Sequence, residues 1–268
     1  MSKTNQAFPR PLAVITGASA GIGKVFAQQL AERGFDLLLV ARDAGRLTAL
    51  ADELALQYGV AAEAWPADLS RDEGMRKLAE ALARSDRLMV LVNNAGFGTK
   101  GLLATRPVGE QATMLELHVM APMLLTRAAL PGMLARREGV IITVSSVASF
   151  MTNRGSVNYC ATKAYQRVLM ESLALELEGT GVRAQALCPG FVHTEFHDRA
   201  QMKKTAIPGI PWLDAGYVVR ESLAAAFGDG PVVVIPKFSY RFVTWLFQVT
   251  PRSIRQAFQR RYGRARVE

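Results

Sequence analysis

The sequence has little cysteine and no long hydrophobic run. Of its 268 residues only Cys160 and Cys188 are cysteines, too few for a disulfide framework and typical of proteins in a reducing compartment. The polar start, MSKTNQAFPRP, lacks the apolar stretch of a secretory signal. No uninterrupted run approaches the roughly 18 apolar residues that a membrane span requires. We therefore expect a cytoplasmic protein.

Acidic residues are almost absent from the end of the chain. Residues 231–268 contain eight lysines and arginines but one acid, Glu268, so this segment has +7 of the formal net charge of +9. The first 230 residues, with the remaining +2, are close to neutral. Because the excess charge is local, the basic composition of the whole chain does not indicate a nucleic-acid-binding protein.

What the sequence does contain is an alternation of short apolar runs and longer amphipathic stretches. Half of the residues are hydrophobic, enough for the core of one large domain. Several runs are continuously apolar, which is typical of parallel strands covered on both faces. The alternation predicts an α/β, Rossmann-like, doubly wound fold with a seven-stranded parallel sheet and helices on both faces. The expected strands are 12–16, 36–41, 61–66, 88–92, 140–145, 182–188 and 232–235, and the expected helices are 22–33, 44–58, 71–84, 108–136, 157–178 and 214–227.

We expect a single domain over residues 1–236 and a basic, amphipathic extension over residues 237–268. No internal repeat, low-complexity segment or linker divides the first part. The extension mixes aromatic and aliphatic residues with arginines, as in FSYRFVTWLFQV. Four interpretations are open for it: a flap over an apolar site, an interfacial helix on an anionic membrane, a nucleic-acid contact, or a solvated helix packed on the domain.

Glycines directly follow the first expected strand. The segment TGASAGIG, residues 16–23, ends that strand and opens the first helix. Gly17, Gly21 and Gly23 allow a tight turn in which backbone amides approach a pyrophosphate at the helix N-terminus. The spacing is GxxxGxG, and the alternative is a strand–helix turn that binds no ligand.

The second expected strand ends in Ala41-Arg42-Asp43. An acid at a strand end of this kind binds the ribose 2′-hydroxyl of NAD, whereas an arginine accommodates the 2′-phosphate of NADP. Arg42 therefore indicates NADP(H), the alternative being an exposed loop charge. Asp43 is expected to cap the following helix.

Tyr159 and Lys163 are four residues apart, and Ser146 precedes the tyrosine by thirteen residues. On a helix, residues i and i+4 share a face, so the phenol and the ammonium would lie side by side. A nearby cation lowers the pKa of a phenol from its usual value of about 10 and tunes it as a general acid. Ser146 would add a hydroxyl that holds a substrate oxygen. Alone, the pair is also compatible with a solvated lysine beside a packed tyrosine.

Further motifs complete the pattern: Asp68-Leu69 after the third expected strand, NNAG at residues 93–96 after the fourth, and PGFVHT at residues 189–194 after the sixth. In this order, the set resembles the short-chain dehydrogenase/reductase (SDR) superfamily over residues 10–236, and within it the branch of acyl- and ketone-reducing enzymes. The resemblance implies an NADP(H)-dependent oxidoreductase that interconverts a ketone or aldehyde with an alcohol by hydride transfer. Tyr159 would be its general acid and base.

The resemblance also implies a role for each matching residue. Ser146, Tyr159 and Lys163 would be catalytic, Ser146 being preferred to Ser145 because of its offset from Tyr159. Lys163 would also hold the nicotinamide ribose and lower the pKa of the tyrosine. The cofactor would contact the turn at Thr16, Gly17, Ser19, Gly21, Ile22 and Gly23, the 2′-phosphate site at Arg42, the adenosine site at Asp68, Leu69, Asn94, Ala95 and Gly96, and the nicotinamide site at Tyr159, Lys163, Pro189, Gly190, Val192 and Thr194.

Two positions depart from the family pattern. Many NADP(H)-preferring relatives have a basic residue where this chain has Ala20, which leaves the 2′-phosphate to Arg42 and Lys24. Relatives also usually have an asparagine 28 residues before the serine, where it helps to bind a water that leads to the lysine, and here His118 stands at that position. We include His118 among the catalytic candidates, because imidazole could serve this water chain and titrate within it. The alternative is a packed histidine.

No metal site is expected. His193 and His197 are spaced i, i+4, but the order HTEFH is not the HExxH arrangement of zinc enzymes, and polar loop residues are the simpler interpretation. Cys160 is expected to be a small buried hydrophobe. Family members commonly pair the long helix and the catalytic helix across a two-fold axis, which implies a homodimer or homotetramer. The methionines expected in the core or at that interface are Met114, Met120, Met123 and Met133.

The segments expected to line the substrate site are 97–105, 150–154 and 196–212. They are rich in Phe, Met, Leu and Ile, which indicates a hydrophobic carbonyl compound. The rival function is a non-catalytic nucleotide-sensing or scaffold protein that keeps the fold. The intact Ser146, Tyr159 and Lys163 argue against it, and His118 is the chemical feature in its favour.

Overall fold

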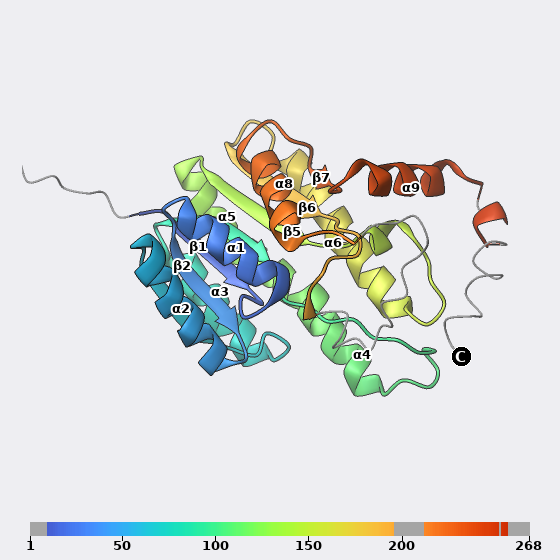
Figure 1. Ribbon diagram of the computed structural model, residues 1–268, viewed down its shortest axis with the longest axis horizontal. Coiled ribbons are helices and arrows are strands. Elements are labelled where there is room, and N and C mark those ends of the chain that lie inside the picture. The colour runs from blue at the N-terminus through green and yellow to red at the C-terminus, as the bar shows by residue number, and fades with distance from the viewer. Residues whose placement is uncertain (1–9, 196–211, 252, 257–268) are drawn as a thin grey trace, which may run out of the picture.

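Seven parallel strands form one sheet through the middle of the protein, in the order β3-β2-β1-β4-β5-β6-β7 (Figure 1). The structure is a computed structural model that describes residues 10–195, 212–251 and 253–256. The sheet confirms the predicted doubly wound fold, in which the chain moves outward from β1 in both directions. The strands are β1 (Leu12–Thr16), β2 (Asp36–Ala41), β3 (Ala62–Pro66), β4 (Leu88–Asn93), β5 (Gly139–Val144), β6 (Val182–Leu187) and β7 (Val233–Val234).

Helices cover both faces of this sheet and form two separate hydrophobic cores. In β1, Ala13 and Ile15 pack with the helices of one face, whereas Val14 packs with those of the other. This alternation follows from the two-residue period of a strand and explains why the strand sequences are continuously apolar. One face is covered by α1 (Gly21–Glu32), α2 (Ala44–Tyr58) and α8 (Ala215–Phe227), and the other by α3 (Asp72–Arg84), α5 (Ala121–Arg136) and α6 (Val157–Glu176).

The long helix expected over residues 108–136 is interrupted. It consists of α4 (Val108–Leu115), a π-helical turn η1 (Glu116–Met120) and α5, and the amide of Ala121 donates to the carbonyl of Glu116 five residues back. Pro122 has no N–H, so the carbonyl of His118 has no helical donor four residues ahead. The π turn therefore leaves one backbone carbonyl free to accept from a side chain.

By length and mean hydropathy the stretch Val108–Arg136 could cross a membrane. The sequence expectation, which counted uninterrupted apolar runs, did not detect it. In this fold Leu125, Ala129 and Met133 of the stretch pack against the sheet. Met114 and Met133 are buried, Met123 is partly buried and Met120 is exposed.

The chain continues beyond β7 into α9 (Phe238–Val249), at the periphery of the molecule in Figure 1. The other elements begin and end within two residues of their expected bounds. The division between a domain at 1–236 and an extension at 237–268 stays a prediction, and most of residues 252–268 lies outside the described residues.

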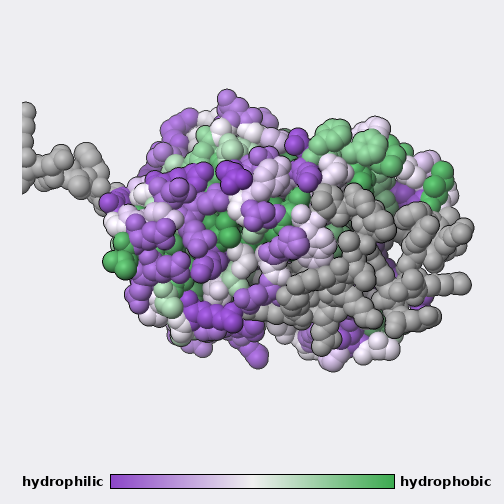
Figure 2. Space-filling view, in the orientation of Figure 1, coloured by the Kyte–Doolittle hydropathy of each residue, from purple (hydrophilic) through white to green (hydrophobic). Residues whose placement is uncertain are grey.

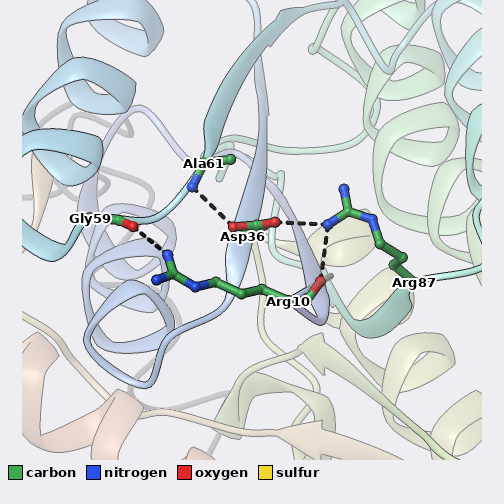
Figure 3. Close-up of polar contacts among 5 residues, drawn as sticks. All are labelled: Arg10, Asp36, Gly59, Ala61 and Arg87. Carbon is green, nitrogen blue, oxygen red and sulfur yellow. Dashed lines mark hydrogen bonds and ion pairs between the residues drawn. The ribbon is translucent and has the colours of Figure 1, made fainter. Parts of the chain in front are cut away.

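A charged cluster holds the amino ends of the first four strands together (Figure 3). Asp36, at the start of β2, accepts from the amide of Ala61 at 3.0 Å and from Arg87 at 2.7 Å. Arg87 also donates to the carbonyl of Arg10 at 3.0 Å, and the guanidinium of Arg10 donates to the carbonyl of Gly59. This network closes the amino edge of the sheet and lies at the opposite end from the predicted site.

Candidate active site

The carboxyl ends of β1 and β4 are joined at the point where the sheet order reverses. The hydroxyl of Thr16 accepts from the amides of Asn94 at 2.9 Å and Ala95 at 3.1 Å. The side-chain amide of Asn94 donates in return to the carbonyls of Thr16 at 2.9 Å and Gly17 at 3.2 Å. Asn94 thus holds the glycine turn in place, a structural task beyond the adenosine contact expected for it.

The glycine turn leaves no space for a side chain at Gly17 or Gly23. Gly17 has φ of +66°, and a Cβ added to Gly23 would lie 2.2 Å from the carbonyl oxygen of Gly17. Helix α1 begins at Gly21, and the side chain of Ala20 does not cap it. The first amides of α1 therefore face the carboxyl edge without a capping side chain, which fits the pyrophosphate of a dinucleotide. Ser19 and Ile22 lie half-buried on the same turn.

Arg42 is exposed at the end of β2 and close to Asp68. Partial burial would raise the pKa of Asp68, but hydrogen bonds from the hydroxyl and amide of Ser70 and the charge of Arg42 outweigh it and lower that pKa. Asp43 accepts from the amide of Arg46 at 3.0 Å and caps α2, as predicted. Lys24 pairs with Glu53 at 3.5 Å, which leaves Arg42 as the better candidate for a 2′-phosphate.

The loop after β6 lies against the glycine turn. A Cβ added to Gly21 would lie 3.3 Å from the Cβ of Thr194. Glu195 forms an ion pair of 3.1 Å with Arg46 at the start of α2. Pro189 accepts from the amide of Val147 at 3.0 Å, so the same loop also adjoins the end of β5. The residues expected at the nicotinamide end thus lie between the glycine turn and the serine pair.

The two adjacent serines at the end of β5 point to different partners. The hydroxyl of Ser145 is buried and donates to the carbonyl of Lys163 at 2.7 Å. Ser146 lies at the start of η2 (Val147–Phe150), where its hydroxyl accepts from the amide of Ala148 at 3.1 Å. A side-chain hydrogen bond also joins Ser146 to Tyr159. The geometry therefore favours Ser146 over Ser145 as the partner of a substrate oxygen.

Tyr159 and Lys163 lie on one face of α6, as their spacing predicts. The Lys163 Nζ atom lies 5.8 Å from the centroid of the Tyr159 ring. The lysine side chain is buried, and its amine donates to the Val144 carbonyl at 2.8 Å and to the Gln166 Oε1 atom at 2.9 Å. Both acceptors are neutral, so neither of them compensates the charge of a buried ammonium.

The pKa values of this pair differ from the sequence expectation. Burial raises the pKa of Tyr159 to about 12, although the hydrogen bond with Ser146 lowers it. Burial likewise lowers the pKa of Lys163 to about 7. The expectation that the lysine charge lowers the tyrosine pKa is therefore wrong for this state of the protein. Removal from water disfavours the charged forms of both groups.

His118 lies within the π turn and has no exposed surface. Its Nε2 atom accepts from the amide of Phe97 at 3.0 Å, so that nitrogen bears no proton. The Nδ1 atom, 3.0 Å from the hydroxyl of Thr162, must then be the donor, and Thr162 donates onward to the Tyr159 carbonyl at 3.1 Å. Burial and, secondarily, the charge of Lys163 hold the pKa of His118 well below 6.5. The geometry favours the packed, neutral histidine over one that titrates in a water chain.

Gln166 is a member of this cluster that the sequence reasoning missed. It lies three residues after Lys163 and is buried, accepting from the lysine amine. Its own amide donates at 2.9 Å to the His118 carbonyl, the group that Pro122 leaves without a helical donor. The Gln166 carboxamide joins Lys163 directly to the π turn, whereas the family pattern implied that a water makes this link. A glutamine at this spacing was visible in the sequence, but its burial was not.

The HTEFH segment lies only partly within the described residues. His193 stacks on Trp212 with ring centroids 5.1 Å apart, and His197 lies outside the described part of the chain. Among the residues that are described, no three histidines, cysteines or acids lie close enough together to hold a metal ion. Cys160 is buried and free, as expected for a small apolar residue.

Comparisons with known proteins agree with this arrangement. The profile of a protein family described as short chain dehydrogenase matches residues 11–205. The 3-oxoacyl-acyl-carrier-protein reductase of Aquifex aeolicus is 33% identical over 185 residues, which cover 69% of this chain and 75% of that protein. A short-chain dehydrogenase from Sphingobium yanoikuyae, solved in complex with NADPH, superposes with a TM-score of 0.81 at 33% identity and covers 92% of this chain and 94% of its own. The bulky-bulky ketone specific alcohol dehydrogenase from Comamonas testosteroni superposes with a TM-score of 0.77 at 28% identity. The match covers 96% of this chain and 94% of that one.

The lowered pKa of Lys163 predicts a pH-dependent contribution to stability. Between the folded value of about 7 and the unfolded value of about 10.4, the unfolded chain binds one more proton than the folded one. The free energy of unfolding of the unmodified protein should therefore rise with pH in this window, relative to Lys163→Met, by at most about 1.4 kcal/mol per pH unit. Urea unfolding of both proteins across this window measures the difference. Lys77→Met, at an exposed lysine on α3, is the control and should give a difference that stays flat. A flat difference for Lys163→Met would mean that the buried amine stays charged.

The neutral state of His118 predicts that it does not shape the pH–rate profile. For His118→Asn we expect a lower rate, because the links to Phe97 and Thr162 are altered, but unchanged midpoints between about pH 6 and 9. The measurement is kcat/KM against pH for both proteins. A midpoint that moves in the variant would assign the histidine a proton-transfer role and contradict the packed arrangement.

Proposed function

Because the chain belongs to the short-chain dehydrogenase family, we propose that it is an NADP(H)-dependent oxidoreductase that interconverts a hydrophobic ketone or aldehyde with the corresponding alcohol. The single observation that supports this reaction most is the hydrogen bond between Ser146 and Tyr159 beside the buried Lys163. Two hydroxyl groups at the carboxyl edge of a doubly wound sheet can hold and protonate one carbonyl oxygen. A binding module would not need that arrangement.

In this proposal each residue has a distinct task. Ser146 donates to the substrate oxygen and orients it, and Tyr159 gives a proton to that oxygen in reduction or takes it in oxidation. Lys163 places a group of adjustable charge beside the phenol. His118 and Gln166 are positioning residues, since they fix the π turn and the lysine amine without reaching the substrate. The nicotinamide ring, when bound, supplies or accepts the hydride.

The residues at the carboxyl edge fit an NADP(H) molecule. The glycine turn would hold its pyrophosphate, and Arg42 would bind the 2′-phosphate through a charge-assisted contact. Asp43, the acid that could instead favour NAD(H), is occupied as the cap of α2. The Sphingobium yanoikuyae relative, solved with NADPH, supports the same preference.

Apolar side chains support a hydrophobic substrate. Phe97 packs edge-on against His118 with centroids 5.8 Å apart, next to the Tyr159 ring. Phe191 lies 5.4 Å from Trp212 between their ring centroids. The relative from Comamonas testosteroni is specific for bulky-bulky ketones and the one from Aquifex aeolicus reduces an oxoacyl group, so both classes belong in the test panel. Most of the segment 196–212, which we expected to line the same site, lies outside the described residues.

The proposal includes a homodimer or homotetramer in the cytosol. Exposed aliphatic side chains on α5 and α6, such as Leu134, Val168 and Leu175, suit a subunit interface formed by these two helices. Cys160 and Cys188 are both free and buried, which suits a reducing compartment.

Tyr159→Phe tests the reaction. The phenyl ring preserves the packing beside Lys163, but it cannot transfer a proton, so reduction of an active ketone should slow by about 10²–10⁴-fold. NADPH oxidation is followed by absorbance over a panel of acyl, steroid and aromatic ketones, with NADPH binding measured separately. Tyr165→Phe, two residues beyond the lysine on the same helix, is the matched control and should retain turnover. Turnover that survives Tyr159→Phe would overturn the mechanism, and NADPH binding without turnover of any ketone by the unmodified protein would favour a nucleotide sensor.

Arg42→Ser tests the cofactor preference. Loss of a charge-assisted contact worth about 1.5–3 kcal/mol should lower kcat/KM for NADPH by roughly 10–150-fold and leave the value for NADH almost unchanged. The same substitution at Arg84, an exposed arginine at the end of α3, should change neither value. If Arg42→Ser alters both cofactors equally, the arginine does not read the 2′-phosphate.

A further inference from the structure

Helix α9 is anchored to the domain by Tyr240. The ring of Tyr240 is buried and lies directly on Gly190, where an added Cβ would come within 2.0 Å of it. The amide of Phe191 donates to the Tyr240 hydroxyl at 3.0 Å. Thr244, one turn later and also buried, donates to the Tyr240 carbonyl at 2.8 Å. The contacts of Tyr240 with Gly190 and Phe191 fix which face of α9 points outward.

The outward face of α9 is apolar. Its five large residues recur at the i, i+4, i+7, i+8 and i+11 positions of one helical stripe, and each is 47–74% exposed. Phe238 and Phe242 stack with centroids 6.4 Å apart, and Phe242 lies 5.9 Å from Trp245. Figure 2 shows hydrophobic side chains gathered where α9 lies in Figure 1. We call this stripe the α9 outer face: Phe238, Phe242, Trp245, Leu246 and Val249.

An ordinary surface helix exposes a polar side, whereas α9 exposes an apolar stripe. Contiguous exposed aromatic and aliphatic groups mark a surface that binds something apolar. By contrast, Leu56 is the single large hydrophobic residue exposed on α2, and such isolated residues need no explanation. The α9 outer face therefore requires an occupant.

The charge around the α9 outer face identifies that occupant. Lys237 and Arg241 are exposed beside it, and the guanidinium of Arg255 lies 5.3 Å from the Phe247 ring. Residues 231–267 contain eight basic side chains and no acidic one. Aromatic rings flanked by arginines and lysines match an anionic bilayer, whose headgroup region takes up the rings while its phosphates meet the cations. A second copy of the same basic surface would instead be repelled.

We propose that α9 binds the protein to an anionic lipid bilayer, with the α9 outer face in the headgroup region and Lys237 and Arg241 beside the lipid phosphates. The helix packs against η2, which begins directly after Ser146, and against the Gly190 turn. Attachment through α9 would therefore bring the membrane next to the carboxyl edge of the sheet. This inference does not depend on the reaction, because it concerns only how the surface binds lipid.

Co-sedimentation of the full-length protein with vesicles tests the proposal. We expect binding to vesicles of phosphatidylcholine mixed with phosphatidylglycerol, little binding to pure phosphatidylcholine, and release by high salt. The double variant Phe242→Ser/Trp245→Ser should lower the partition coefficient at least about tenfold. Leu56→Ser, which removes an isolated exposed residue, should bind like the unmodified protein. Equal binding of the double variant, equal binding to both kinds of vesicle, or no binding at all would each overturn the proposal.

A spectroscopic measurement guards against misfolding of the double variant. Brominated phosphatidylcholine in the anionic vesicles should quench the tryptophan fluorescence of the unmodified protein, because Trp245 enters the headgroup region. Trp245→Phe keeps an apolar ring and should still bind, but it should lose most of the quenching, since Trp65 and Trp212 are not part of the α9 outer face and are not exposed. Quenching that persists in Trp245→Phe would place another surface on the membrane. Concentration-dependent self-association that Trp245→Ser abolishes, without vesicle binding, would assign the face to a second copy of the chain.

Discussion

The buried amine of Lys163 dictates the arrangement of its whole surroundings. An amine removed from water needs hydrogen-bond acceptors, and here the Val144 carbonyl and the Gln166 carboxamide provide them. Gln166 in turn needs an acceptor for its own N–H, and the His118 carbonyl serves because Pro122 offers it no helical donor. The π turn is thus a structural requirement of the lysine and not a defect of the long helix.

The same hydrogen-bond network continues from the π turn to the loop after β4 and to α6. The His118 imidazole, held in the π turn, accepts from Phe97 after β4 and donates to Thr162 on α6. Four separate parts of the chain are joined in this way: the end of β5, the loop after β4, the π turn and α6. Every polar atom named in this chain has a partner, which is what allows so many polar groups to be buried together.

The sequence predicted the fold well because its strands are continuously apolar and its helices amphipathic, two signals that depend on local pattern alone. It also predicted that the residues following these strands gather at one edge of the sheet, because the carboxyl ends of parallel strands all lie at that edge. It could not predict the π turn, the partners of Ser145 and Ser146, or the burial of Gln166. Each of these depends on which backbone groups lie opposite one another across segments distant in sequence, as with Gln166 and the His118 carbonyl.

The pKa values show where reasoning from spacing alone was incomplete. Spacing placed a cation beside a phenol, but it did not give the free-energy cost of taking both groups out of water, which here dominates. With its pKa raised by burial, the phenol of Tyr159 retains its proton at pH 7. In the proposed reaction, such a phenol would donate its proton to the oxygen of a carbonyl undergoing reduction. Oxidation of an alcohol would instead require the phenolate, a form that burial disfavours and that a positive charge on Lys163 would favour. Under that proposal, the protonation of the buried lysine would bias the direction of proton transfer.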